Sequence, residues 1–241
     1  MSDICIIVGH GKSKSGGYDS GAVSKDGKIH EFKIAKEIAK HAVEHLNQKY
    51  MTTASLMNYK GDKYLTERIK DVNSSNYKFI AEIHLNAGSG TGTECFYYHG
   101  SPTGRKAADL ISKEIALALD VNQRDNGVDD GGDKVKLNKN GKDYFAIIRD
   151  TKPCAVLVET VFIDHEPDLA KVKTAEGQKK CGVAVAEGIA KALGLELVPE
   201  EEATKKKLYR VCVGAYAVKS NADAMKAGLE KLGFDAYIVE V

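Results

Sequence analysis

Two histidines and two carboxylates occupy places in the sequence from which they could form a metal-dependent hydrolytic site. His10 follows one apolar, strand-like run, and His84 lies near the end of a second one. Glu159 lies inside a third apolar run, where a carboxylate is costly to bury unless it is paired or functional. Glu31 stands at the start of a helical pattern, after a turn-prone segment. Because ligands bind outside the carboxyl ends of strands in open parallel α/β sheets, we expect the four side chains to converge.

This set of side chains is the one that a catalytic zinc site uses. Such a site takes three ligands from His and Asp/Glu and leaves its fourth position to water. We therefore predict that His10, Glu31 and His84 bind one Zn²⁺ ion and that Glu159 acts as general base and then as general acid. Two alternatives stay open. In one, the histidines and Glu159 are hydrogen-bonded structural groups; in the other, His30 replaces Glu31 as a ligand.

Two further motifs suggest chemistry that their surroundings do not support. The segment Gly9–Ser13 matches the end of a phosphate-binding loop, but the position that needs the first glycine is Ile6, inside a strand-like run. His41 and His45 match an H-x-x-E-H zinc-peptidase pattern. They lie at the edge of the apolar stripe of their helix, so we predict a solvated helix face there.

The elements that must position these residues alternate between strand and helix patterns. Strand-like apolar runs cover residues 4–8, 52–57, 79–85, 93–98, 144–149 and 155–161, and helical patterns cover residues 31–47, 62–73, 103–119 and 176–193. Strands that alternate with helices predict an α/β fold, with a mostly parallel sheet of about six strands flanked by helices.

The connection over residues 120–143 is rich in Gly, Asp, Asn and Lys and shows no periodicity. Loops of this length are uncommon in compact domains and are usually functional or mobile. We expect it to contact a bound substrate, with a mobile surface insertion as the alternative. The candidate substrate contacts, in this segment and near the strand ends, are Asn86, Arg124, Asp129, Asp130, Lys134 and His165.

Composition excludes several classes of protein. Among 241 residues, 35 Lys and Arg oppose 34 Asp and Glu, so a net charge of +1 gives no support for binding nucleic acid or an anionic membrane. No apolar run approaches the roughly 20 residues of a membrane helix, so we expect no membrane insertion. The N-terminus lacks the basic region of a signal peptide, which predicts synthesis in the cytoplasm without an export signal. The five cysteines form no CxxC pair, and we expect them to be small buried hydrophobes.

The pattern changes after Leu195. Residues 196–207 contain a charge run and predict an exposed linker. Residues 208–241 predict a small βαβ module, with strands at 209–213 and 236–241 around a helix at 221–232. A chain below roughly 40 residues rarely buries enough apolar surface to fold alone, so this module must dock on the first domain or pair with a second copy.

Several segments together resemble a known enzyme family. They are Val8-Gly9-His10-Gly11, Asp19-Ser20-Gly21-Ala22, Glu31, Ile83-His84-Leu85-Asn86-Ala87 and the stretch from Arg149 to Glu159. In order and approximate spacing, residues 4–193 resemble the zinc-dependent N-acetylmuramoyl-L-alanine amidases, the peptidoglycan hydrolases of bacterial cell-wall remodelling and phage lysis.

The resemblance implies a function and a set of roles. The amide between the lactyl group of N-acetylmuramic acid and L-alanine would be the scissile bond. One Zn²⁺ in the catalytic domain, residues 1–195, would be held by His10, Glu31 and His84, with Glu159 as the catalytic residue. Two residues depart from the family pattern: Ser20 stands where proline is usual, and His165 where asparagine is common. We expect both to change loop shape or substrate contacts and to leave the metal site intact.

The tail, residues 208–241, resembles one repeat of the SPOR-type peptidoglycan-binding domain, which usually contains two βαβ repeats. The single repeat implies a homodimer in which each chain supplies one.

With no export signal, the chain fits a phage-type endolysin that is made in the host cytoplasm and acts on the cell wall after release. A bacterial autolysin that reaches the wall by an unusual route also fits. A zinc peptidase that cleaves the peptidoglycan stem peptide would use the same residues. A non-catalytic wall-binding protein is the third alternative, but it would have no need of Glu159 as a base.

Overall fold

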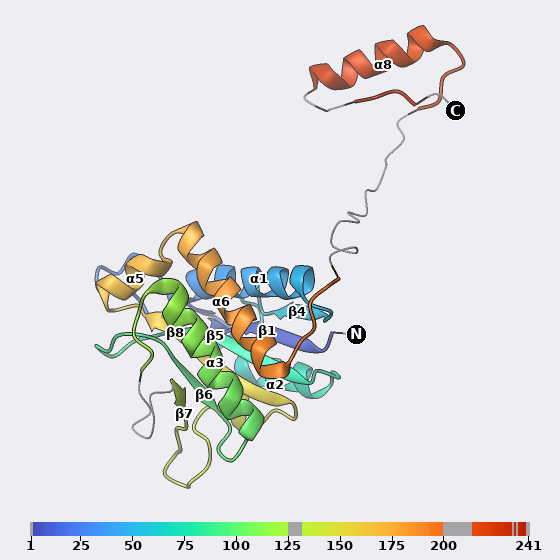
Figure 1. Cartoon of the computed structure of the whole chain (residues 1–241). Helices are drawn as coiled ribbons and strands as arrows, with labels where there is room; N and C mark the ends of the chain where they lie inside the picture. Colours follow the sequence, from blue (N-terminus) through green and yellow to red (C-terminus); the bar gives the residue numbers. More distant parts are fainter. Residues whose placement is uncertain (1, 125–131, 200–213, 233, 235, 240–241) are drawn as a thin grey trace. The chain divides into compact units, whose positions relative to one another are not determined.

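The computed structural model describes residues 2–124, 132–199, 214–232, 234 and 236–239. The chain divides into two compact units, Met1–Pro199 and Glu200–Val241, which are considered separately (Figure 1). No helix in the described ranges combines the length and the apolarity needed to cross a membrane.

The first unit is a six-stranded sheet flanked by helices, as the alternation of patterns predicts. Its strands are β1 (Ile4–Val8), β4 (Ala54–Met57), β5 (Phe79–Asn86), β6 (Glu94–Tyr97), β7 (Asp133–Lys134) and β8 (Cys154–Phe162), and its helices are α1 (Glu31–Lys49), α2 (Leu65–Asn73), α3 (Pro102–Leu119), α4 (Ala146–Arg149), α5 (Glu166–Val172) and α6 (Ala175–Leu193). The strand order is β4-β1-β5-β8-β6-β7, and a separate hairpin pairs β2 (Gly11–Lys12) with β3 (Tyr18–Asp19). Strands β4, β1, β5 and β8 are parallel, and β6 is antiparallel to β8.

Helices cover both faces of the sheet, which explains why β1 is apolar at every position. In β1, Ile4, Ile6 and Val8 belong to the larger core, which α1, α3 and α6 complete. Cys5 and Ile7 point to the other face and pack in a smaller core with residues of α2 and α4. The fully buried pattern of β1 is therefore that of a strand covered on both sides.

Strand register brings the chemical groups to one edge of the sheet. Val8, the last residue of β1, pairs with Ile83 of β5, and the next residue of β5, His84, pairs with Glu159 of β8. On the far side of β8, Glu159 also faces Glu94 of β6. The register of β5 against β8 shifts by a bulge between His84 and Asn86, and pairing resumes between Asn86 and Phe162.

The structure differs from the sequence expectation in three places. The run at residues 144–149 is the short helix α4, with Ile147 and Ile148 both buried against the smaller core. A short apolar run cannot be assigned to strand or helix from periodicity alone. Within the described part of residues 120–143, β7 pairs with β6 and a bridge joins Leu137 to Asp143. Helix α5 had no matching prediction.

The second unit contains helix α8 (Lys219–Lys231), close to the predicted helix at 221–232. The predicted strand at 209–213 lies outside the described residues. Residues 236–239 form no strand, because a strand needs a neighbour to receive its backbone hydrogen bonds and none is present among the described residues of this unit. No residue of α8 is buried. The exposed apolar side chains of this unit include Met225, Leu232, Phe234, Tyr237 and Ile238.

Candidate metal centre

His10, Glu31 and His84 meet at the carboxyl ends of β1 and β5 and could hold a metal ion. Nε2 of His10 lies 3.2 Å from Oε2 of Glu31, and Nδ1 of His84 lies 2.8 Å from Oε1. The three ligand atoms all lie within 4.8 Å of one another. Tetrahedral zinc with bonds of about 2.0–2.1 Å separates its ligand atoms by about 3.3 Å, so this arrangement fits the ion with small adjustments. Among the described residues, no other group of three possible ligands is so placed.

Two backbone features bring the two histidines together: the left-handed conformation of His10 and the absence of a side chain at Gly9. His10 has a φ of +61°, a left-handed conformation that non-glycine residues rarely adopt. Asn58 holds it there, because its Nδ2 donates hydrogen bonds to the carbonyls of Val8 and His10, each at 2.8 Å. At Gly9, a Cβ would lie only 2.3 Å from the imidazole of His84. The close approach of the two histidines therefore requires glycine at this position.

Glu31 is fixed as the central ligand by backbone donors. It is the first residue of α1, and its side chain is 3% exposed. Its Oε2 accepts a hydrogen bond from the amide of Ala22 at 2.7 Å, and its Oε1 accepts one from the amide of Leu85 at 3.0 Å. Burial favours the neutral acid, but hydrogen bonds and charge from the two histidines outweigh it and hold the pKa of Glu31 well below its ordinary value.

A carboxylate contacts the outer nitrogen of each histidine. Oδ2 of Asp19 lies 2.9 Å from Nδ1 of His10, and Oε2 of Glu82 lies 3.2 Å from Nε2 of His84. These contacts orient Nε2 of His10 and Nδ1 of His84 toward the centre. Burial lowers the pKa of both histidines, but the surrounding carboxylates outweigh it and raise both pKa values above the ordinary one. A metal ion would therefore displace protons when it binds.

Glu159 lies beside His84 of the neighbouring strand β5, with Glu94 of β6 on its other side. Its Oε2 is buried and has no hydrogen-bond partner among the described residues. Burial raises the pKa of Glu159 to about 7, since charge from His84 offsets only part of the desolvation. A carboxyl group that titrates near neutral pH can both accept and donate a proton under physiological conditions, as general acid–base catalysis requires.

Of the predicted substrate contacts, three are joined through the buried carboxylate of Glu94, the cross-strand neighbour of Glu159. Oε1 of Glu94 accepts a hydrogen bond from Nδ2 of Asn86 at 2.5 Å, while its Oε2 contacts Nε of Arg124 at 2.7 Å and Nζ of Lys134 at 2.5 Å. The guanidinium of Arg124 also stacks on Phe162, 4.9 Å from the ring centroid. These three side chains therefore lie near Glu159 but are held by internal contacts.

His165, another of the predicted contacts, is held by Asp168 and not by Glu94. His165 is partly exposed, and its Nδ1 lies 2.9 Å from Oδ1 of Asp168. Asp129 and Asp130 lie outside the described residues. His30, the alternative ligand, is the residue before α1 and does not belong to the ligand group.

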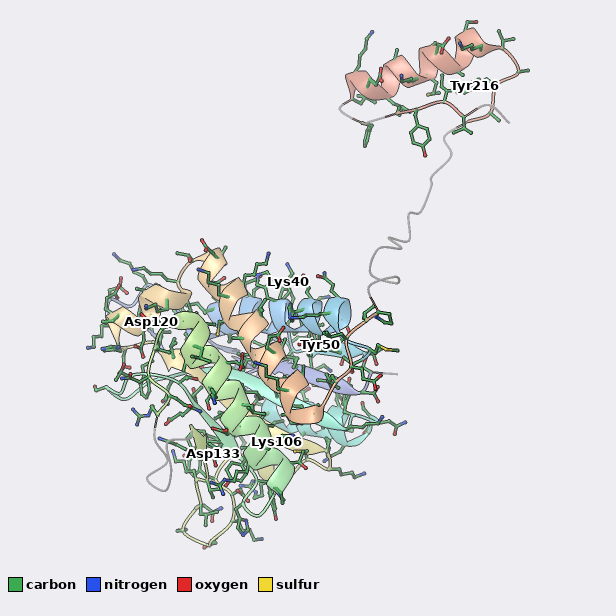
Figure 2. The ribbon with its side chains drawn as sticks, in the orientation of Figure 1. Lys40, Tyr50, Lys106, Asp120, Asp133 and Tyr216 are labelled. Atoms are coloured by element: carbon green, nitrogen blue, oxygen red, sulfur yellow. The ribbon has the colours of Figure 1, made fainter. Side chains whose placement is uncertain are left out.

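The H-x-x-E-H motif, residues 41–45, lies on α1 directly after Lys40, which is labelled in Figure 2. Nδ1 of His41 contacts Glu44 of the same helix at 3.1 Å, whereas Nε2 of His45 contacts Glu187 of α6 at 2.7 Å. The two histidines therefore have separate carboxylate partners and do not meet at one point. His45 is only 21% exposed and joins α1 to α6, so the predicted solvated face does not extend to this residue.

Sequence reasoning missed Asp19, Glu82, Arg68 and Glu94 as residues of the site. For Glu82 and Glu94 a signal existed, because each is a carboxylate inside an apolar strand, the same feature that singled out Glu159. Asp19 and Arg68 gave no comparable signal, since one lies in a hairpin and the other on a helix with ordinary charged neighbours.

Comparison with known proteins gives a consistent family. A family model described as N-acetylmuramoyl-L-alanine amidase matches residues 4–191. The chain is 30% identical to the N-acetylmuramoyl-L-alanine amidase CwlM of Bacillus licheniformis, over 99% of this chain and 85% of that protein. It is 28% identical to an endolysin of Bacillus phage SPP1, over 84% of this chain and 70% of that protein. The solved structure of Cwp6 from Clostridium difficile matches with a TM-score of 0.68 and 30% identity, covering 80% of this chain and 30% of that chain.

Proposed function

The chain belongs to the family of N-acetylmuramoyl-L-alanine amidases, and we propose that it is a zinc-dependent member that cleaves peptidoglycan to lyse the cell wall. The bond broken is the amide between the lactyl carbonyl of N-acetylmuramic acid and the nitrogen of L-alanine. The observation that carries the zinc dependence is the convergence of His10, Glu31 and His84 on one point, with Glu159 beside them.

In the proposed site, three residues would hold the ion and a fourth would transfer a proton. Zinc, when bound, polarises the scissile carbonyl and lowers the pKa of water at its open position. His10 would present Nε2, His84 would present Nδ1, and Glu31 would supply the negatively charged ligand between them. Asp19 and Glu82 would keep the two imidazoles in the required orientation and tautomer.

Glu159 would carry the proton through the reaction. Its carboxylate takes a proton from the attacking water at Oε2, the oxygen that has no other partner. The water oxygen forms a bond to the lactyl carbonyl carbon, and the bond from this carbon to the alanine nitrogen breaks. Glu159 then delivers the proton to that nitrogen. The products are the lactyl carboxylic acid and a stem peptide with a free amino group on L-alanine.

The substrate would be positioned by residues around Glu159. Asn86, Arg124 and Lys134 surround Glu94 on the strand next to Glu159, and we propose that substrate groups bind against this network. His165 comes shortly after β8, and we propose that it contributes to the same substrate site. Asp129 and Asp130 complete the proposed set within residues 125–131.

We further propose that residues 208–241 form a SPOR-like wall-binding module that a linker joins to the catalytic domain predicted at 1–195. The linker predicted at 196–207 starts too early, because Leu197 forms a bridge with Tyr50 and the first unit extends to Pro199. The exposed apolar side chains of the second unit support pairing of two copies, since so small a unit rarely folds without a partner surface. Sedimentation of the full chain as a dimer, and of a chain ending at residue 199 as a monomer, is the expected result. A monomeric full chain would contradict the dimer.

A role in lysis is supported by the similarity to the endolysin of Bacillus phage SPP1. The expected observation is a fall in turbidity when the purified protein, loaded with zinc, is added to a suspension of bacterial cell walls. The Glu159→Gln protein should bind the same walls without clearing them.

Mass spectrometry of digested peptidoglycan tests the reaction itself. New free amino groups on L-alanine, lost when a chelator removes the metal and restored by added zinc, are the expected result. Release of a D-amino acid would instead identify a stem-peptide peptidase, which would use the same residues. Activity that survives complete removal of metal would contradict zinc dependence.

A further inference from the structure

We propose that Arg68 and Glu82 act together as a positioning unit that sets the geometry of both metal-binding histidines. This inference rests on the proposed zinc function and adds two residues that touch neither ion nor substrate. The two side chains are among the few charged groups buried in the first unit, at 6% and 3% exposure, and they lie beneath the metal centre.

Glu82 acts on His84. It precedes His84 by two residues in β5, so the two side chains project from the same face of the strand. Its Oε2 lies 3.2 Å from Nε2 of His84, the nitrogen that points away from the other ligands. A carboxylate at this place favours the tautomer with hydrogen on Nε2 and leaves the lone pair of Nδ1 directed at the ion.

Arg68 connects this carboxylate to the backbone of the other histidine. Its Nε lies 3.2 Å from Oε1 of Glu82, as an ion pair without hydrogen-bond alignment. Its Nη1 donates a hydrogen bond to the carbonyl of His10 at 2.7 Å. One guanidinium thus links α2, the end of β1 and the middle of β5.

The hydrogen bond to His10 matters because this residue has a left-handed backbone. A non-glycine residue in this region keeps its conformation only where the surroundings enforce it. Arg68 and Asn58 both donate to the carbonyl of His10, and this fixes the direction in which its imidazole leaves the chain. Loss of Arg68 would release one of these contacts and at the same time leave Glu82 as a buried charge without its counter-ion.

The test measures zinc affinity, which a purely structural ion pair would not change. The Glu82→Gln protein keeps the shape of the side chain but loses its charge, and Arg68→Lys keeps the charge but loses the planar fork. We expect each folded, full-length variant to bind zinc roughly 10- to 100-fold more weakly than the wild type, in competition with a fluorescent zinc indicator. The absorption spectrum of the cobalt-substituted protein should shift, because the geometry of the ligands changes.

Glu187→Gln is the matched control. Glu187 is also a largely buried carboxylate with several cationic or hydroxyl partners, but it lies on α6 against the end of α1. Its substitution should lower the melting temperature and leave zinc affinity unchanged.

The zinc affinities of the variants and of the wild type distinguish a failure of the positioning role from a failure of the proposed function. Wild-type zinc affinity in folded Glu82→Gln and Arg68→Lys proteins would overturn the positioning role alone. If Glu82→Gln fails to fold, the affinity of the Arg68→Lys protein decides. A wild-type chain that binds no zinc would overturn the proposed function and this inference with it.

Discussion

Replacement of Gly9 by alanine tests the metal centre at the point where its packing is tightest. The added Cβ would lie 2.3 Å from Cε1, 2.4 Å from Nε2 and 2.7 Å from Nδ1 of His84. Ordinary contact begins at 3.4 Å, so the imidazole must retreat by about 1 Å. It cannot retreat freely, because its outer nitrogen meets the buried carboxylate of Glu82. A displacement of about 1 Å in a catalytic group is enough to cost about 100-fold in rate.

The expected result for Gly9→Ala is therefore a loss of zinc affinity together with a fall of about 100-fold in kcat/KM. Zinc content by atomic absorption, zinc affinity by competition and release of free amino groups from purified peptidoglycan measure the three quantities. Gly17→Ala is the matched control, because a Cβ there meets only Oγ of Ser13, at an ordinary 3.6 Å. Wild-type zinc affinity in the Gly9→Ala protein would refute the argument that His84 must lie against Gly9 when it binds metal.

Three further results are expected. Glu159→Gln should bind zinc with wild-type affinity and lose at least about 100-fold in kcat, because only the proton carrier is removed; reduced zinc content would contradict the assignment. Asp19→Ala should weaken zinc binding by roughly 10-fold or more, by freeing the outer nitrogen of His10, and equal affinities in a competition titration would count against this. Glu187→Gln should lower the melting temperature at pH 7, and the difference from wild type should disappear between pH 4.5 and about pH 2 in a series of thermal melts. A difference that persists below pH 2 would show that ionisation of Glu187 is not the cause.

The direction of this pH dependence of stability follows from the contacts of Glu187. Burial opposes its ionisation, but hydrogen bonds from Lys49, His45 and Tyr50 outweigh burial and lower its pKa to about 2 (Tyr50 is labelled in Figure 2). Because the pKa is lower in the folded chain than in the unfolded one, the carboxylate stabilises the fold fully above pH 4.5. This contribution falls as the pH drops toward 2. The carboxylate ties α6 to the end of α1, so its loss should loosen that packing.

The sequence predicted most of the sheet and the position of the central residues of the site, for a reason that lies in strand geometry. Parallel strands of similar length end at one edge, so side chains that follow or end an apolar run are brought together whatever the intervening helices do. His10 and His84 were found in this way, and Glu159 was found because it is a carboxylate inside an apolar run. Glu31 was proposed because it stands at the start of a helical pattern, after a turn-prone segment.

The features that the sequence did not predict depend on contacts between segments far apart in the chain, which a local sequence pattern does not show. Arg68 looks like any charged residue of an amphipathic helix until α2 packs beneath β5 and carries its guanidinium to Glu82. Residues 144–149 have apolar content that suits a strand, but the adjacent residues Ile147 and Ile148 are both buried on one side, which a helix allows and a strand with alternating faces does not. In the second unit, the strand predicted at 236–241 depends on a pairing partner that the described residues do not supply.

The formal charges of the candidate metal centre can balance without an ion. When His10 and His84 are both protonated, they and Arg68 balance the carboxylates of Asp19, Glu31 and Glu82. A Zn²⁺ ion that displaces the two protons brings the same two positive charges, so the sum over the centre stays zero. In the metal-free chain, burial is the main influence on the pKa of Glu159, and the charge of His84 opposes it most strongly. We therefore expect the two outer carboxylates to have a second effect besides orienting the imidazoles: their negative charge would offset part of the positive charge that an ion brings close to Glu159, and so favour a carboxyl group that can return its proton to the leaving nitrogen.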